Sequence, residues 1–230
     1  MSEIIKDFSL FAKDKGVSSL VLDDVIKQTN TTSLLYPTIV EERNSAMRVN
    51  EMNVFSRLIQ DRVMFLSGDV TPDSMDVLVA QLLYLDSVDD RDINLYINSN
   101  GGDCYSGLEL VSVMNFINSK VSTTVLGLAA SMGAVIASSG EKGMRYALPY
   151  SRFMIHQPSS SFGRATFTDS KIHLQEMESI RQDLYTVLAQ NSGHDVDTII
   201  QLCENGDKWL KTDEAISLGF LDYKLEKKIC

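Results

Sequence analysis

The chain has 230 residues, of which 44% are hydrophobic and 23% charged, so it is long enough and apolar enough to bury a core. It carries 31 Asp and Glu against 21 Lys and Arg, a net charge of −10, which argues against nucleic-acid binding. The longest mostly apolar stretch, residues 125–137, is shorter than the roughly 18 to 20 residues that a membrane-spanning helix needs.

The N-terminal region differs from the rest. Residues 1–34 end in the polar stretch KQTNTTS, which is typical of a linker, and they lack the continuous apolar core of a secretory signal. Residues 35–53 contain apolar positions followed by charged ones, as in a poorly ordered terminus. The three cysteines, Cys104, Cys203 and Cys230, are far apart and odd in number, so we expect neither disulfides nor a zinc site. This cysteine usage predicts a reducing compartment.

From residue 54 onward the sequence alternates strands and helices. Short apolar or β-branched runs predict strands at 63–66, 93–97, 121–126 and 152–155. Helical spacing of apolar residues predicts helices at 71–85, 105–118, 134–139, 171–191, 195–204 and 212–218. This alternation indicates an α/β fold with crossover connections.

One of the three histidines stands out by its position. His156 directly follows the expected strand 152–155, whereas His173 lies in a polar helix and His194 in a turn before a helix. Groups at the C-terminal ends of strands line the active crevice of an α/β sheet. His156 is therefore the candidate catalytic histidine, and the other two are expected to be inert.

A serine lies at a second strand-to-helix junction. Ser131 stands in GLAASMGA (127–134), between the strand 121–126 and the next helix, with small residues on both sides. This is similar to a nucleophile elbow, although Ala129 replaces the first glycine of G-x-S-x-G. A serine that N-caps a buried helix explains the pattern equally well.

Two glycines follow the strand 93–97, in NSNGGD (98–103). Gly101 and Gly102 could direct backbone N–H groups into a crevice, as an oxyanion hole requires, or simply make a tight turn. A phosphate loop is not indicated, because neither GxxxxGKS/T nor GxGxxG is present.

Four segments in this order carry a resemblance to a known family. The segments YINSNGG (96–102), GLAASMGA (127–134), SRFMIHQP (151–158) and DKWLKTDEA (207–215), the last followed by GFLD (219–222), resemble the ClpP-type serine proteases. The similarity covers residues 54–225. By matching position, Ser131 resembles the family's nucleophile, His156 its general base and acid, and Asp207 the carboxylate that orients the histidine. The backbone N–H groups of Gly102 and Met132 match its oxyanion hole.

The resemblance implies an α/β, ClpP/crotonase-like spiral core with a protruding strand-helix handle at about 159–191. Residues 1–34 would be an N-terminal extension or propeptide, 35–53 an axial-pore loop segment, and 54–230 the protease domain. Members form two stacked heptameric rings in the cytoplasm and receive unfolded proteins from an AAA+ unfoldase of the ClpX, ClpA or ClpC type. The proteolytic subunit needs no cofactor or metal, and the unfoldase uses the ATP. Leu83, Tyr96 and Phe116 would either line the docking pockets or belong to the core.

The chain departs from the family pattern beside the glycines. Asn100 stands where the family usually has proline, and Asp103 and Cys104 replace residues that are commonly apolar or small. Cys104 is expected to be inert. Two alternatives remain open: a non-catalytic ring subunit, which would lose members of the triad, and a crotonase-fold acyl-CoA enzyme, which would not need the triad. Asp207 is not distinguished from a surface turn acid by composition, so its role rests on the resemblance.

Overall fold

The structure is a computed structural model that describes residues 38–42, 49–161 and 163–227. The chain divides into two compact units with the boundary after Asp61. In the first unit, β1 (Thr38–Glu42) and β2 (Val49–Asn53) pair antiparallel, and helix α3 (Val54–Gln60) follows. The expected extension, 1–34, lies outside the described residues, as do 35–37 and 43–48 of the expected pore segment.

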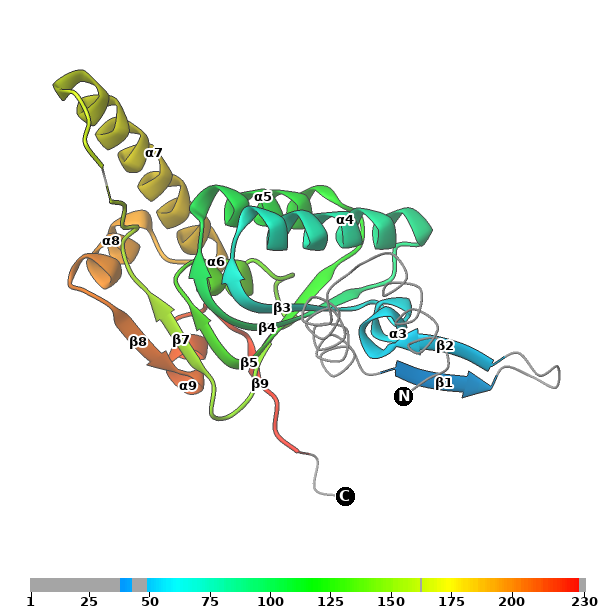
Figure 1. Ribbon diagram of the computed structural model, residues 1–230. Helices are drawn as coiled ribbons and strands as arrows, with labels where there is room; N and C mark the ends of the chain where they lie inside the picture. The colour runs from blue at the N-terminus through cyan, green and yellow to red at the C-terminus, as the bar shows by residue number, and fades with distance from the viewer. Residues whose placement is uncertain (1–37, 43–48, 162, 228–230) are drawn as a thin grey trace, which may run out of the picture. The chain divides into compact units, whose positions relative to one another are not determined.

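A mostly parallel sheet forms the centre of the second unit (Figure 1). Its strands run in the order β3 (Val63–Val70), β4 (Ile93–Gly102), β5 (Val121–Ala130), β6 (Arg145–Ala147) and β9 (Tyr223–Lys224). Strand β5 changes partner along its length, since residues 123–125 pair with β6 and 128–130 with β7 (Arg152–Ile155). Strand β8 (Lys208–Lys211) joins β7 antiparallel.

Helices cover the face of this sheet that carries the core. Met64, Leu66, Leu95 and Ile97 alternate along β3 and β4 and are at most 2% exposed. Helices α4 (Pro72–Val88) and α5 (Cys104–Phe116) lie over these strands (Figure 1). Helix α6 (Met132–Ser138) is buried along its whole length, so the segment after Ser131 belongs to the core.

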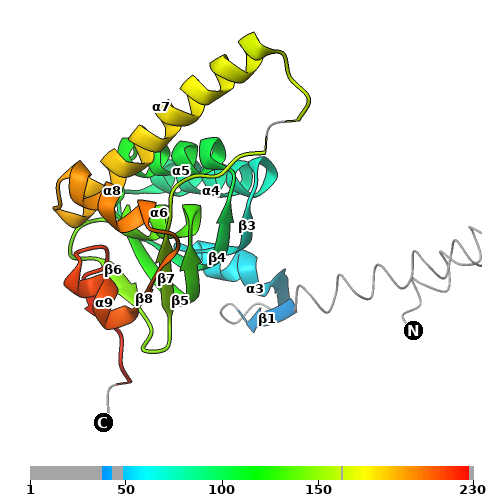
Figure 2. The ribbon, with the colours of Figure 1, turned by 90° about the vertical axis from the view of Figure 1, so that its left-hand side faces the viewer.

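Helix α7 (Phe167–Ser192) projects from the rest of this unit (Figures 1 and 2). Its buried residues, Leu184, Tyr185, Leu188 and Ala189, all lie in its C-terminal part. It begins four residues before the expected start because Thr166 and Asp169 form a capping box, in which each side chain accepts a hydrogen bond from the other's backbone N–H. Helices α8 (Val196–Glu204) and α9 (Thr212–Ser217) follow. None of the helices in the described ranges is long and apolar enough to cross a bilayer.

The prediction of an α/β fold is confirmed, but the predicted end of the strand 93–97 is wrong. Strand β4 does not stop at Ile97 but runs through Gly102, because pairing with β3 resumes after an irregularity, with Asp69 opposite Gly101. A Cβ atom on Gly102 would lie 2.2 Å from the Val70 carbonyl oxygen. The glycine therefore permits close approach of two strands rather than a tight turn. The short strands β6, β8 and β9 were not predicted.

Candidate active site

Ser131 occupies a strained junction between β5 and α6. Its backbone has φ 54° and ψ −124°, a combination that is unfavourable for residues with a side chain. Its N–H donates to the Met154 carbonyl oxygen at 2.9 Å, which ties the junction to β7. The Ser131 side chain makes no capping hydrogen bond, so the helix-cap interpretation is wrong. The place of Ser131, between the end of β5 and the start of α6, is that of the serine in a nucleophile elbow.

His156 lies within hydrogen-bonding distance of this serine. It follows β7 directly, and β7 pairs with the end of β5, with Ala130 opposite Met154. The sheet thereby brings together two residues that are 25 positions apart, and the Ser131 Oγ to His156 Nε2 distance is 2.8 Å. The serine and histidine singled out in the sequence therefore meet in space.

Asp207 lies on the other side of the imidazole. It immediately precedes β8, whose antiparallel pairing sets Lys208 opposite Ile155. The Asp207 Oδ1 to His156 Nδ1 distance is 3.6 Å, which is slightly longer than a hydrogen bond. The Asp207 side chain is 56% exposed and that of His156 25%. The carboxylate can thus favour the tautomer that carries its proton on Nδ1 and leaves Nε2 free to accept from Ser131.

A backbone N–H group without an acceptor in its helix lies next to the serine. Met132 is the first residue of α6, so its N–H has no acceptor within the helix. The end of β4 presses against this point: a Cβ atom on Gly101 would lie 2.8 Å from the Met132 nitrogen. Gly102 follows directly and is exposed. The carboxylate of the next residue, Asp103, caps α5 and accepts from the Ser106 N–H at 2.8 Å.

A small apolar pocket opens next to the serine and histidine, and we call it the Ser131 pocket. Its volume is about 20 Å³. It is lined by Cys104, Ser131, Met132, Val135, Ile155, His156, Pro158, Leu184, Tyr185 and Leu188. Three of these come from α7, and no sequence signal linked them to the site. Burial, and then the charge of Asp103, raises the pKa of the Cys104 thiol, which agrees with its expected inertness.

A larger cavity of about 420 Å³ adjoins this pocket and shares Cys104 and Pro158 with it. Gly102 lines it, together with residues of α5, the segment after His156 and α7. The Tyr105 hydroxyl donates to Glu176 Oε1 at 3.0 Å and so joins α5 to α7.

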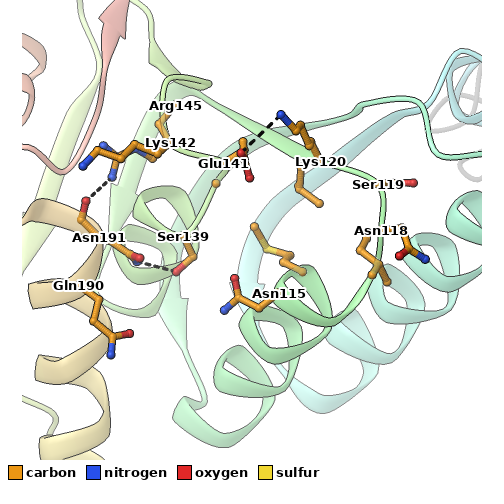
Figure 3. Close-up of a pocket in the computed structure, with 14 residues that line it drawn as sticks. Asn115, Asn118, Ser119, Lys120, Ser139, Glu141, Lys142, Arg145, Gln190 and Asn191 are labelled. Atoms are coloured by element: carbon orange, nitrogen blue, oxygen red, sulfur yellow. Dashed lines mark hydrogen bonds and ion pairs between the residues drawn. The ribbon is translucent and has the colours of Figure 1, made fainter.

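A third pocket, of about 290 Å³, contains none of the three proposed catalytic residues (Figure 3). Its polar side chains largely bind one another. Arg145 Nη1 donates to the Asn191 carbonyl oxygen at 2.7 Å, and Asn191 Nδ2 donates to Ser139 Oγ at 2.9 Å (Figure 3). Lys120 Nζ lies 3.7 Å from Glu141 Oε1 (Figure 3). These contacts connect β6, α6 and α7, so the pocket has a structural explanation.

The remaining residues singled out in the sequence lie apart from Ser131. His173 lines the larger cavity and is exposed, and His194 lies between α7 and α8. Leu83 and Phe116 are 44% and 81% exposed, which contradicts a core role for them. Tyr96 is half-buried and stacks on Phe65 with ring centroids 5.5 Å apart. In the described part of the chain, no three His, Cys, Asp or Glu side chains are placed to hold a metal ion.

Comparison with known proteins gives a consistent family. Residues 45–228 match the family model of the Clp protease. The chain is 43% identical over 224 residues to a protein of Bacteroides thetaiotaomicron, and 42% identical over 224 residues to one of Bacteroides fragilis; each match covers 96% of this chain and 99% of the relative. A Porphyromonas gingivalis protein is 40% identical over 214 residues, 92% of this chain and 93% of its own length. All three are named ATP-dependent Clp protease proteolytic subunit. The chain therefore belongs to the Clp protease family of serine peptidases.

Proposed function

We propose that this serine peptidase is an endopeptidase that cuts unfolded proteins into short peptides, with Ser131 as the nucleophile. The single observation that carries the assignment is the 2.8 Å distance between Ser131 Oγ and His156 Nε2. A serine hydroxyl is a weak nucleophile until a base takes its proton. His156 would accept that proton as Oγ attacks the scissile carbonyl carbon, and would return it to the leaving amine.

Asp207 would orient the imidazole and stabilise the imidazolium that forms during attack. The Asp207 Oδ1 atom lies 3.6 Å from His156 Nδ1, and the Asp207 side chain is 56% exposed. Both values support a role in orienting the imidazole rather than a buried charge pair. The N–H groups of Gly102 and Met132 would bind the oxyanion, which is the charge that develops in the transition state. A water molecule that gives up its proton to His156 would then attack the ester carbonyl of the acyl enzyme, so that the acyl–Oγ bond breaks, the acyl product leaves as a carboxylic acid, and Ser131 takes back its proton from His156. The reaction requires no cofactor of this subunit.

The test uses the assembled full chain and diisopropyl fluorophosphate, read by intact mass. Attack by Ser131 forms an O–P bond, fluoride leaves, and the proton passes to His156. One diisopropylphosphoryl adduct on the wild type and none on Ser131→Ala is the expected result. An unmodified wild-type protein would contradict the assignment and favour the non-catalytic ring subunit. The same spectrum reports whether an N-terminal segment has been removed.

We further propose that the subunit assembles into two stacked heptameric rings in the cytoplasm and works with an AAA+ unfoldase of the ClpX, ClpA or ClpC type. The name of the relatives, ATP-dependent Clp protease proteolytic subunit, supports an ATPase partner. The projecting half of α7 supports contacts between copies, since Phe167, Ile172 and Leu174 are 86%, 58% and 63% exposed.

Leu83, Tyr96 and Phe116 are proposed to line the docking pockets for the unfoldase. Leu83 and Phe116 belong to the helical layer, whereas Tyr96 lies on the face of β4 opposite the buried Leu95 and Ile97. A pocket that includes all three would therefore need two neighbouring copies. Replacing Phe116 by Ser should lower the ratio of ATP-dependent protein degradation to small-peptide cleavage. Tyr150→Ser, at a residue 92% exposed elsewhere, is the matched control.

A further inference from the structure

We propose that Asn205 is a site of spontaneous deamidation, and that the isoaspartate formed there inactivates the enzyme by displacing Asp207. Asn205 and Gly206 immediately precede Asp207 in the chain. The modification follows from the geometry of this Asn–Gly pair alone. Its effect on activity rests on the proposed function, since it acts through the carboxylate that orients His156.

The chemistry requires an asparagine followed by glycine, because glycine has no side chain to keep the asparagine side chain away from the next backbone nitrogen. The Gly206 nitrogen forms a bond to Asn205 Cγ, the Cγ–Nδ2 bond breaks, and the Gly206 proton leaves with the amide nitrogen as ammonia. Water then opens the cyclic imide. Addition of water at Cγ gives aspartate, whereas addition at the main-chain carbonyl carbon gives isoaspartate, in which the chain continues through Cγ.

The surroundings of Asn205 leave this reaction unhindered. Asn205 is the first residue after α8 and is exposed, and its Nδ2 donates to the Gln201 carbonyl oxygen at 3.1 Å on the solvent-facing surface. Among the described residues, none accepts a hydrogen bond from the Gly206 N–H. Gly206 has φ +98°, and nothing lies within 4 Å of a Cβ atom added to it. The backbone therefore has room to rotate until the Gly206 nitrogen meets Asn205 Cγ.

The other Asn–Gly pair of the sequence, Asn100–Gly101, is protected although Asn100 is exposed. The Gly101 N–H donates to Ser99 Oγ at 3.1 Å, and Gly101 lies opposite Asp69 in the sheet. A Cβ atom added to Gly101 would lie 2.6 Å from the Ala130 carbonyl oxygen. Closing the imide ring requires rotation of the backbone here, which would break the end of β4. The structure thus separates a reactive pair from an unreactive one.

The segment 205–207 joins two elements that are both fixed by packing. Helix α8 ends at residue 204 and is anchored by Cys203, which is fully buried. Strand β8 begins at residue 208, pairs with β7 and is anchored by Leu210, which is 3% exposed. An isoaspartate lengthens the main chain between them by one carbon atom. Because packed elements do not shift without disturbing several neighbours, the displacement falls on Gly206 and Asp207.

Asp207 is the catalytic group most easily displaced in this way. Its side chain is 56% exposed, and its Oδ1 atom lies 3.6 Å from His156 Nδ1. Small misplacements of reacting groups lower rates about 100-fold, so a copy that carries isoaspartate should lose about that factor in kcat. The activity of a sample should therefore fall in proportion to the fraction of copies modified.

The test ages the assembled full chain in mildly alkaline buffer and follows two quantities in the same samples. Peptide mass mapping measures the conversion of amide to acid at each Asn–Gly pair. Transfer of a labelled methyl group from S-adenosylmethionine by an isoaspartate-specific protein methyltransferase measures isoaspartate. We expect Asn205 to convert while Asn100 stays an amide, and peptidase activity to fall in step with the isoaspartate at position 205.

Two variants isolate the cause of the loss. Asn205→Gln keeps an amide, but its longer side chain closes the corresponding ring far more slowly, so it should start at wild-type activity and keep it on ageing. Freshly prepared Asn205→Asp has the added charge on a normal backbone and should stay within about twofold of wild-type activity, because solvent and salt screen an exposed charge. An inactive fresh Asn205→Asp would show that charge, not displacement of Asp207, inactivates the enzyme.

The remaining outcomes distinguish this proposal from the proposed function. An Asn205 that stays an amide on ageing, or converts no faster than Asn100, would overturn the modification site. Complete conversion to isoaspartate with unchanged activity would overturn the effect on Asp207. No activity at the start, together with no phosphoryl adduct on Ser131, would overturn the proposed function and with it the effect on activity, while the mass mapping would still decide whether Asn205 is modified.

Discussion

Gly101 lies so close to Ser131 that a Cβ atom on the glycine would be 2.7 Å from the serine Cβ. The same added atom would lie 2.6 Å from the Ala130 carbonyl oxygen, which is backbone and cannot rotate away. Gly101 also has φ +89°, which favours glycine. The end of β4 thus supports the junction that carries the nucleophile.

Gly101→Ala should therefore displace Ser131 and lower kcat/KM about 100-fold or more, since small misplacements of reacting groups have effects of this size. Gly143→Ala is the matched control, because Gly143 has φ +87° but nothing within 4 Å of an added Cβ. The control should lose only about 1 kcal/mol of unfolding free energy and keep its activity. Equal activity losses in the two variants would show that backbone strain, not contact with Ser131, is responsible.

The strained backbone of Ser131 predicts a conflict between stability and activity. Ser131→Ala and Ser131→Gly should both be inactive, because each lacks the hydroxyl. Ser131→Gly should unfold at the higher temperature of the two, because glycine tolerates φ 54° and ψ −124° while alanine does not. We expect about 1 kcal/mol in its favour from thermal unfolding of the assembled protein. A lower melting temperature for the glycine variant would contradict the strain.

Asp207→Asn should lower kcat roughly 10² to 10⁴-fold while leaving the fold intact, because an amide favours the wrong imidazole tautomer. The effect should fall mainly on kcat and hardly on KM, since the carboxylate acts through His156. Asp213→Asn serves as the control for an exposed carboxylate outside the site, because the Asp213 side chain is 75% exposed. An unchanged kcat in Asp207→Asn would contradict the prediction, because it would show that Asp207 does not orient His156.

The strand centres could be predicted because their composition is locally apolar, but their ends could not. Residues 93–97 form an apolar run, whereas the continuation of β4 through Gly102 depends on pairing with β3. The KWLK segment of β8 carries no strand pattern of its own and is extended because it pairs with β7. The three-dimensional position of Asp207 depends on that pairing, so composition alone could not distinguish it from other surface acids.

The serine and histidine could be predicted because each follows a recognisable strand. The lining of the Ser131 pocket could not be predicted in this way. Periodicity shows that Leu184 and Leu188 lie on the buried face of α7, but not which element that face contacts. The departure at Cys104 was visible in the sequence, while its position in the lining of the Ser131 pocket follows from the start of α5.

Arg145 and Asp222 form a buried ion pair that predicts a pH dependence of stability. The Arg145 side chain is 3% exposed and that of Asp222 15%, and Nη2 lies 2.6 Å from Oδ1. Burial raises the pKa of Asp222, but the hydrogen bonds and charge of Arg145 outweigh it and leave the pKa below its ordinary value. The folded protein thus binds fewer protons here than the unfolded chain does. The pair's contribution is complete above about pH 4 and is lost as the pH falls through the lowered pKa.

Asp222→Asn should lower the free energy of unfolding at pH 7 by about 3–5 kcal/mol, because it leaves the buried guanidinium without its counter-charge. Urea unfolding of wild type and variant at pH 7 and near pH 3 measures the difference, which should shrink at the lower pH. Asp213→Asn breaks the more exposed contact with Lys224 Nζ at 2.9 Å and should cost at most about 1 kcal/mol at either pH. A difference between wild type and Asp222→Asn that is the same at both pH values would show that the charge of Asp222 does not contribute. The loss would then come from packing around β6 and the end of α7, where Arg145 also donates to the Asn191 carbonyl oxygen.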